Sequence, residues 1–242
     1  MGLISGDFGA IWDSVPKAWP ARVPLAYLCD FICLACGVGL FLRRTAPVAS
    51  RVLLVYLLLW LLLVKGRYIV LAPLVEGPYQ SAGETAVLLA AAWVLYVWFA
   101  AEWDSQHVEF AVGDKGLRIA RVLYGLALIA FGFSHFAYLE LTAPLVPNWL
   151  PAHVFWAYFT GTTYLVAGAA MIIGAFARLA AALSAVQIGL MTVLVWTPIL
   201  AAGHVSEQHW VETVVSCALT AGAWVVADSY RGMPWFTPNN KR

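Results

Sequence analysis

The stretch VPKAWPARV at residues 15–23 recurs in a related form as VPNWLPAHV at residues 146–154, 131 positions further along the chain. Both prolines, and the alanine that follows the second one, keep their places. A second match pairs Glu84-Thr85 with Glu212-Thr213 at an offset of 128. Internal repetition at a nearly fixed spacing indicates a duplicated architecture. The sequence therefore predicts two related halves, each with a proline-broken approach to a long apolar segment.

Apolar residues dominate the chain. They make up 62% of its 242 residues, charged residues make up only 11%, and the mean hydropathy is +0.80. Average soluble domains are about 45–50% apolar and about 25% charged. The composition therefore predicts a polytopic membrane protein surrounded by lipids. The net charge of +1 gives no argument for a nucleic-acid partner.

Seven segments reach the roughly 20 apolar residues that a helix needs to cross a bilayer. They are residues 22–42, 52–74, 84–101, 117–138, 154–176, 179–200 and 210–228. The predicted fold class is all-α, with seven transmembrane helices arranged as two parallel pseudo-repeats of three and four helices. The predicted domains are an interfacial N-terminal segment (1–21), a three-helix repeat (22–101), a cytoplasmic linker without chemistry (102–116), a four-helix unit (117–230) and a cytoplasmic tail (231–242).

Basic residues are distributed unevenly between the two sides of this topology. Ten of the fourteen fall on one side: Arg43, Arg44, Arg51, Lys115, Arg118, Arg121, Arg178, Arg231, Lys241 and Arg242. Loops rich in Lys and Arg face the cytoplasm. The sequence therefore predicts a protein of the bacterial inner membrane, with its N-terminus outside and its C-terminus in the cytoplasm.

Small residues form stripes on two of the predicted helices. Gly125 and Gly132 lie seven residues apart, as do Gly161 and Gly168. Such stripes allow membrane helices to approach closely. They predict a tight helix contact rather than a functional site.

Charged side chains inside a bilayer are costly and are therefore candidates for function. Asp30, Lys65 and Arg67 lie at a similar predicted depth, about 10–14 Å below the outer surface at 1.5 Å per residue. One hypothesis is a structural ion pair between Asp30 and Arg67, with Lys65 as the competing partner. The other is a site for the polar head of an anionic ligand.

Histidines and glutamates gather on the side opposite the basic loops. His135 ends the fourth segment, His153 opens the fifth, and His209 and Glu212 share one helical face near the start of the seventh. Such groups bind a transition metal, relay protons or hydrogen-bond a quinone carbonyl. No metal site is predicted, since a ligand spacing such as HExxH is absent, and plain interfacial roles stay open. Gln187, polar at mid-membrane, either bridges helices or lines a cavity.

Three stretches of the second half resemble the DoxX-like family of membrane proteins: Gly132–Phe136, Leu145–His153 and Phe155–Gly161. The resemblance covers about residues 117–230, the usual four-helix unit of that family. The first half resembles a partial second copy, in which Leu62–Ala90, with Arg67 and Glu84, matches the third-to-fourth helix region. The resemblance implies a quinone-linked role, beside subunits of a membrane oxidoreductase complex or as an assembly helper.

Three functional hypotheses follow. The first is a redox-associated protein that binds a quinone or similar amphiphile between the halves, near the outer leaflet. His135, Glu212, Asp30 and Arg67 would line that pocket, and Glu212 would set the tautomer of His135 for proton transfer. The second is a non-catalytic scaffold or assembly subunit, and the third is a carrier of a small lipid or metabolite. No catalytic residue is assigned.

Overall fold

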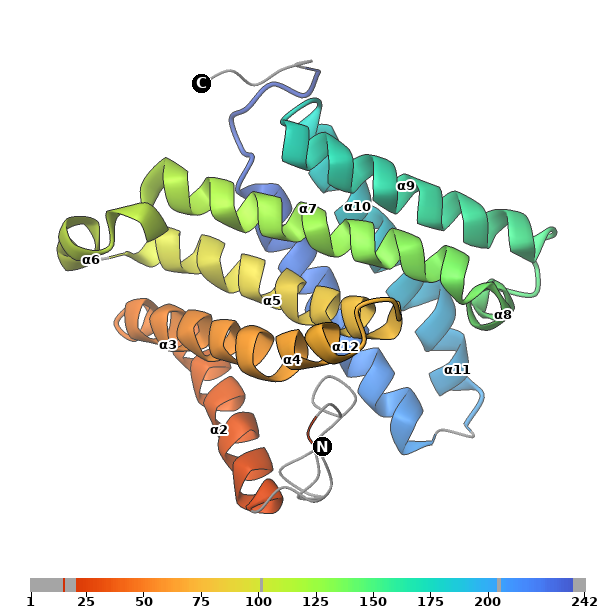
Figure 1. Ribbon diagram of the computed structural model, residues 1–242, viewed down its shortest axis with the longest axis horizontal. Coiled ribbons are helices and arrows are strands. Elements are labelled where there is room, and N and C mark those ends of the chain that lie inside the picture. Colours follow the sequence, from red (N-terminus) through yellow and green to blue (C-terminus); the bar gives the residue numbers. More distant parts are fainter. Residues whose placement is uncertain (1–14, 16–20, 101, 204–205, 237–242) are drawn as a thin grey trace.

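The computed structural model describes residues 15, 21–100, 102–203 and 206–236, and over these all regular secondary structure is helical (Figure 1). The predicted interfacial segment falls almost wholly outside the described residues, as do the last six residues of the predicted tail. Seven helices are long and apolar enough to cross a membrane, so the chain is a polytopic helical membrane protein.

The seven spans are built from the following helices. They are α2 (Arg22–Phe41), α3 (Ala46–Leu59) continued by η2 (Trp60–Lys65) and α4 (Gly66–Leu71), α5 (Gly77–Phe99), α7 (Gly113–Ala137), α9 (His153–Ile173), α10 (Ala177–Met191) continued by η5 (Thr192–Trp196) and α11 (Thr197–Ala201), and α12 (Glu207–Asp228). Short helices fill two connections: α6 (Glu102–His107) and η3 (Glu109–Ala111) join the halves, and α8 (Leu139–Thr142) and η4 (Ala143–Leu145) follow α7.

Two spans begin well before their predicted starts, by six and seven residues (52 − 46 and 84 − 77). The second starts at Ala46 rather than at residue 52, and the third at Gly77 rather than at residue 84. Pro47 and Pro78 occupy the first turns of these helices. Proline is tolerated there because the first backbone N–H groups have no partner within the helix. Each proline therefore lies inside a helix rather than before it.

The repeat is visible in the backbone. Ala21 and Ala152, which are equivalent in the repeated stretch, both adopt left-handed conformations, with φ of 60° and 58°, directly before α2 and α9. The second span of each half is interrupted at matching positions by a π-helical segment, η2 in one half and η5 in the other. The helix contacts match as well: α2 packs on α3 and α3 on α5, as α9 packs on α10 and α10 on α12.

The halves meet through α5, which packs against both α7 and α12 of the second half. Fully buried residues of these helices, such as Val87, Tyr124 and Ala223, belong to the main hydrophobic core. On its other side α7 packs closely along α9, as predicted from the glycine stripes (Figure 1). A Cβ added at Gly168 would lie 2.5 Å from the carbonyl oxygen of Gly125. Only a residue without a side chain allows this approach.

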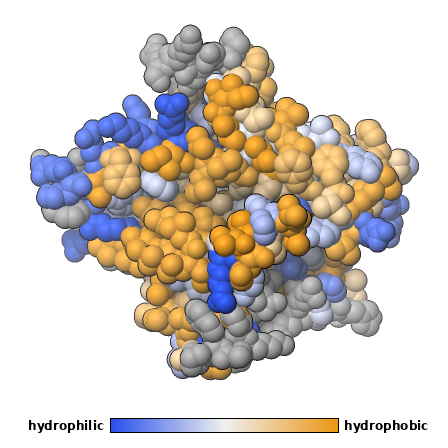
Figure 2. All heavy atoms as spheres, viewed as in Figure 1, coloured by the Kyte–Doolittle hydropathy of each residue, from blue (hydrophilic) through white to orange (hydrophobic). Residues whose placement is uncertain are grey.

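Arginines join separate segments at one end of the bundle. Arg121 donates to the Ser229 side chain and backbone carbonyl, and Arg178 donates to the Met233 carbonyl, so both hold the chain that follows α12. Figure 2 shows hydrophobic residues over most of the viewed face, with hydrophilic ones gathered toward the end where α6 lies. Hydrophilic residues are therefore unevenly distributed over this face.

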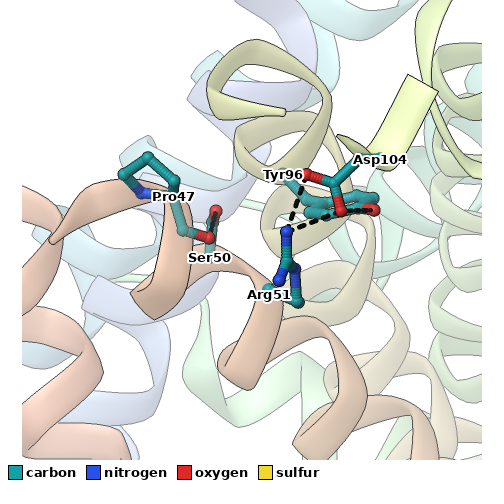
Figure 3. A network of polar contacts seen from close by, with 5 residues as sticks. All are labelled: Pro47, Ser50, Arg51, Tyr96 and Asp104. Atoms are coloured by element: carbon teal, nitrogen blue, oxygen red, sulfur yellow. Dashed lines mark hydrogen bonds and ion pairs between the residues drawn. The ribbon is translucent and has the colours of Figure 1, made fainter. Parts of the chain in front are cut away.

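An ion pair that the sequence did not predict joins a half-exposed arginine of α3 to a buried carboxylate in the connection between the halves. Arg51 lies inside α3 rather than before it, and its guanidinium lies 2.7 Å from both carboxylate oxygens of Asp104 in α6 (Figure 3). Tyr96 of α5 donates its hydroxyl to the same carboxylate at 2.8 Å. Asp104 is only 1% exposed. The connection is thus anchored to the bundle and is not a solvated linker.

Candidate functional site

A cavity of about 750 Å³ runs along the seam between α9 and α10. On α9 its lining extends from Trp156 to Ala170, about 21 Å at 1.5 Å per residue. The connection from Thr142 to Leu150 and the end of α7 border it near the start of α9. Its size lies within the range of about 300–1,000 Å³ that is typical of small-molecule sites. We call this cavity the α9–α10 groove.

Most side chains that line the groove are apolar, and the polar ones gather near Thr160. Gln187 of α10 donates from Nε2 to the Thr160 carbonyl at 3.2 Å and accepts a hydrogen bond from Thr163 at 2.8 Å. Gln187 therefore bridges the two helices and also lines the groove, so it has both of the roles that the sequence left as alternatives. The result is one polar patch in an otherwise apolar channel.

His135 borders the same patch from α7. It is 9% exposed and lines the groove, and its ring lies 5.6 Å from the ring of Tyr164, between centroids. Its Nδ1 lies 2.8 Å from the carbonyl oxygen of Phe131. A carbonyl oxygen can only accept, so Nδ1 carries the hydrogen and Nε2 is the acceptor of the neutral ring. The backbone of α7, and not Glu212, sets the tautomer of His135, which corrects the role predicted for that glutamate.

A second polar cluster lies between the halves. Lys65, the last residue of η2, is 1% exposed and donates from Nζ to the Ser81 hydroxyl of α5 at 2.6 Å. Glu84 follows Ser81 by three residues, hence on the same helical face. It interacts electrostatically with both Lys65 and Glu212 of α12. In the described part of the chain no hydrogen bond or ion pair joins Glu84 to Lys65 or to Glu212, so Ser81 is the side chain that links Lys65 to α5.

The predicted ion pair between Asp30 and Arg67 does not form. Among the described residues Asp30 pairs with neither Lys65 nor Arg67, and its buried Oδ2 has no hydrogen-bond partner there. Arg67 is exposed on α4, while Lys65 is directed toward α5. Asp30 and Lys65 were predicted at a similar depth but do not pair. Their helices have different neighbours, since α2 packs against α3 and η2 packs against α5.

The two remaining histidines lie at helix starts. His209 completes a capping box with Ser206: its backbone N–H donates to the Ser206 hydroxyl at 3.2 Å, and its Nδ1 accepts from the Ser206 backbone at 3.4 Å. This contact stabilises the first turn of α12. His153 is the first residue of α9, close to the groove but not in its lining. In the described part of the chain no group of His, Cys, Asp or Glu side chains is placed to hold a metal ion.

The polar patch beside His135 and the cluster around Lys65 are separate sites. Within the described residues no hydrogen bond or ion pair joins His135 to Glu212, and the groove lies inside the second half rather than between the halves. Glu84 and Glu212 occupy equivalent positions of the repeat, on the helices α5 and α12, which pack against each other.

The fold and these two sites define an integral α-helical membrane protein made of two related halves. Comparison of the chain with protein-family models, with curated proteins and with solved structures found no match.

Proposed function

We propose that this protein binds an amphiphile with a long apolar chain, a quinone or a molecule of similar shape, in the α9–α10 groove. The observation that carries the proposal is the form of the groove: an elongated apolar channel of about 750 Å³ with one polar patch beside His135. Such a channel suits a linear apolar chain, and the patch suits a small polar head. A hydrophilic metabolite would need a more polar lining, so of the carrier hypothesis only the form with a small lipid fits this groove.

The polar patch also indicates which head group would bind. Because His135 presents an acceptor at Nε2 in its neutral form, it suits a head that donates a hydrogen bond, such as the hydroxyl of a reduced quinone. Thr160 and Gln187 stand beside it on the groove wall. The chain of the amphiphile would extend from this patch past Val166 toward Ala170, where the lining is apolar.

The resemblance to the DoxX-like family and the basic end of the bundle support two further parts of the proposal. The protein is a DoxX-like member with a redox-associated role, and it lies in the bacterial inner membrane with the arginine-rich end in the cytoplasm. The groove would then open near the outer leaflet.

The proposal is tested by filling the groove. Ala170 lines it, whereas its neighbour Ala169 on α9 is exposed outside it. Ala170→Phe should therefore block binding of decylubiquinol to the purified protein, and the matched variant Ala169→Phe should not. Binding is measured by quenching of tryptophan fluorescence, since Trp156 borders the groove. His135→Phe should weaken binding as well.

Solvent extraction of the purified wild-type protein should in addition release a co-purified amphiphile that is absent from Ala170→Phe. If decylubiquinol binds neither wild type nor variants and nothing is extracted, the amphiphile-binding proposal is wrong and a scaffold subunit is the better hypothesis. Equal binding by the Ala170→Phe and Ala169→Phe proteins would place the ligand outside the groove.

A further inference from the structure

The α9–α10 groove opens sideways along both of its helices. Phe159 and Val166 of α9 and Leu183 and Leu190 of α10 line it, and all four side chains are exposed on the surface of the bundle. Exposed apolar side chains of membrane-spanning helices lie against lipid chains, which are as apolar as they are. The groove is therefore open to the bilayer, and a ligand reaches it from the membrane without passing through water.

The polar patch of the groove lies well below the end of α9. Thr160 follows His153, the first residue of α9, by seven residues (160 − 153), which is about 10 Å along the helix at 1.5 Å per residue. His135 lies beside it, since a Cβ added to the neighbouring Gly161 would stand 2.8 Å from the Cβ of His135. On the other side Gln187 donates to the Thr160 carbonyl. The head of a bound amphiphile would therefore lie at a depth where charged groups are costly.

The groove has no charge that would compensate a charge on the ligand. Among the described residues that line it, none is Lys, Arg, Asp or Glu. Arg178 stands next to the lining residue Leu179, but its guanidinium donates to the Met233 carbonyl and lies 4.0 Å from the centroid of the Trp235 ring. An uncompensated charge in apolar surroundings is strongly unfavourable. The lining therefore disfavours a carboxylate, a phosphate or an ammonium head.

Several polar groups of the lining are left as hydrogen-bond acceptors. The Nδ1–H group of neutral His135 donates to the Phe131 carbonyl, so its Nε2 can only accept. The hydroxyls of Thr142, Thr162 and Ser184 donate to carbonyls of preceding residues, so their oxygens can accept as well. A hydroxyl group on a ligand can donate to such acceptors, whereas a ketone, an ester or an ether cannot. The patch therefore favours an uncharged head that donates.

We propose that the ligand of the α9–α10 groove is a lipid with an uncharged hydroxyl head, an alcohol or a phenol. The groove takes this lipid sideways from the bilayer and rejects lipids of similar length whose heads are charged. This inference rests on the proposed function and narrows it to one chemical class. The hydroxyl donates to Nε2 of His135, and the apolar chain lies between α9 and α10, past Val166 and Leu183.

Two photoreactive probes test the charge of the head. Hexadecanol and palmitate have chains of equal length and differ only at the head, and both are given a diazirine at the same carbon. They are added to wild-type protein in phosphatidylcholine nanodiscs, at an alkaline pH that ionises palmitate. Mass spectrometry should find the hexadecanol label on groove residues of α9 and α10. Ala170→Phe should abolish this label, and the matched Ala169→Phe should not.

Palmitate should label the wild-type groove no more than hexadecanol labels Ala170→Phe. Palmitate that labels the groove as strongly as hexadecanol overturns the proposal. Hexadecanol that labels the Ala170→Phe and wild-type proteins equally does so as well. If Ala170→Phe does not fold, the two probes are still compared on the wild-type protein, where a label outside α9 and α10 contradicts the assigned groove.

The methyl ether of hexadecanol tests the hydrogen bond to His135, because an ether accepts but does not donate. In competition with the hexadecanol probe, unlabelled hexadecanol should be about two- to tenfold stronger than the ether, the range expected for one hydrogen bond. In His135→Phe the two competitors should be equal. Equal competition in the wild type, or an advantage of hexadecanol that persists in His135→Phe, contradicts the inference.

This inference and the proposed function can fail separately. If Ala170→Phe blocks decylubiquinol binding but palmitate labels the groove as strongly as hexadecanol, the proposed function stands and the inference is wrong. The inference alone is wrong, too, if decylubiquinol binds in the groove and hexadecanol does not. If Ala170→Phe changes the binding of no probe, both are wrong.

Discussion

At the scale of single residues, the pair of Arg51 and Asp104 should contribute measurably to stability. Asp104→Ala leaves the Tyr96 hydroxyl and the Arg51 guanidinium without their acceptor. A buried polar group without a partner costs about 1–3 kcal/mol. We expect the free energy of unfolding in detergent to fall by about that amount. The matched control is Glu109→Ala, which breaks an exposed pair with Lys115 and should leave the unfolding midpoint unchanged. Equal effects of the two substitutions would contradict this prediction.

Glu76, in the short connection before α5, should make stability depend on pH. Both of its carboxylate oxygens are buried without a hydrogen-bond partner among the described residues, and burial raises its pKa from 4.5 to about 7. The folded protein therefore binds a proton in a pH range where the unfolded chain has lost it. Stability should fall as the pH rises from about 4.5 to about 7, and remain lower above that.

Glu76→Gln removes this dependence. Its unfolding midpoint should exceed that of the wild type by a margin that grows between about pH 4.5 and about pH 7 and then stays constant. The measurement is a series of thermal unfolding curves of both proteins across this range. A margin that shrinks as the pH rises would show that the carboxylate has a stabilising partner.

Lys65 and Asp104 show which properties of single residues could be predicted from the sequence. Hydropathy correctly predicted that Lys65 lies within the second span. The partner of Lys65 could not be predicted in the same way. It depends on the rotation of η2 about its axis and on which helix packs there, and Ser81 of α5, rather than Asp30 of α2, proved to be that partner. Asp104 was missed because its surrounding sequence is hydrophilic and gives no sign of burial.

At the scale of helices, the contact between α7 and α9 should be the least tolerant of added volume. Gly168→Ala would place a methyl group 2.5 Å from the Gly125 carbonyl oxygen. Overpacking of this kind costs about 1–3 kcal/mol. The matched control is Gly37→Ala on α2, where an added Cβ meets nothing within 4 Å. That change should be neutral or stabilising by up to about 1 kcal/mol, because alanine favours the helix over glycine. Unfolding in detergent compares the two proteins, and equal midpoints would contradict the close contact.

Helix ends were predicted less well than helix number, for a reason that Pro47 and Pro78 illustrate. Proline ends a helix in its interior but is favoured in its first turn, so the residue alone does not indicate on which side of it the helix begins. The repeat was the more reliable signal. Pro20-Ala21 and Pro151-Ala152 match in sequence, and the two alanines share one backbone conformation. A duplicated sequence folds twice in the same way where its local interactions are the same.

At the scale of the whole molecule, duplication explains the position of both sites. The two halves have matching helix orders but differ in the polar side chains of their interiors. The first half contains Lys65, and the second contains the polar patch around Thr160 and Gln187. Lys65 is held within the first half, by Ser81 of α5. The sequence predicted that ionisable groups gather toward one end, but not that the divergence of the halves separates them into two sites.

The orientation of the whole molecule is a separate prediction. Because the predicted topology puts ten of the fourteen basic residues on one side, that side should face the cytoplasm. Single cysteines test this in a variant whose four native cysteines are replaced. Gln106, exposed on α6, marks the basic end, and Asn148, exposed in the connection before α9, marks the other end. In right-side-out membrane vesicles a membrane-impermeant maleimide should label Asn148→Cys directly and Gln106→Cys only after detergent is added. The reverse pattern would invert the orientation and would open the α9–α10 groove toward the cytoplasmic leaflet. Labelling of both cysteines without detergent would put them on the same side of the membrane. That result would contradict the prediction that α7, which lies between them in the chain, crosses the membrane.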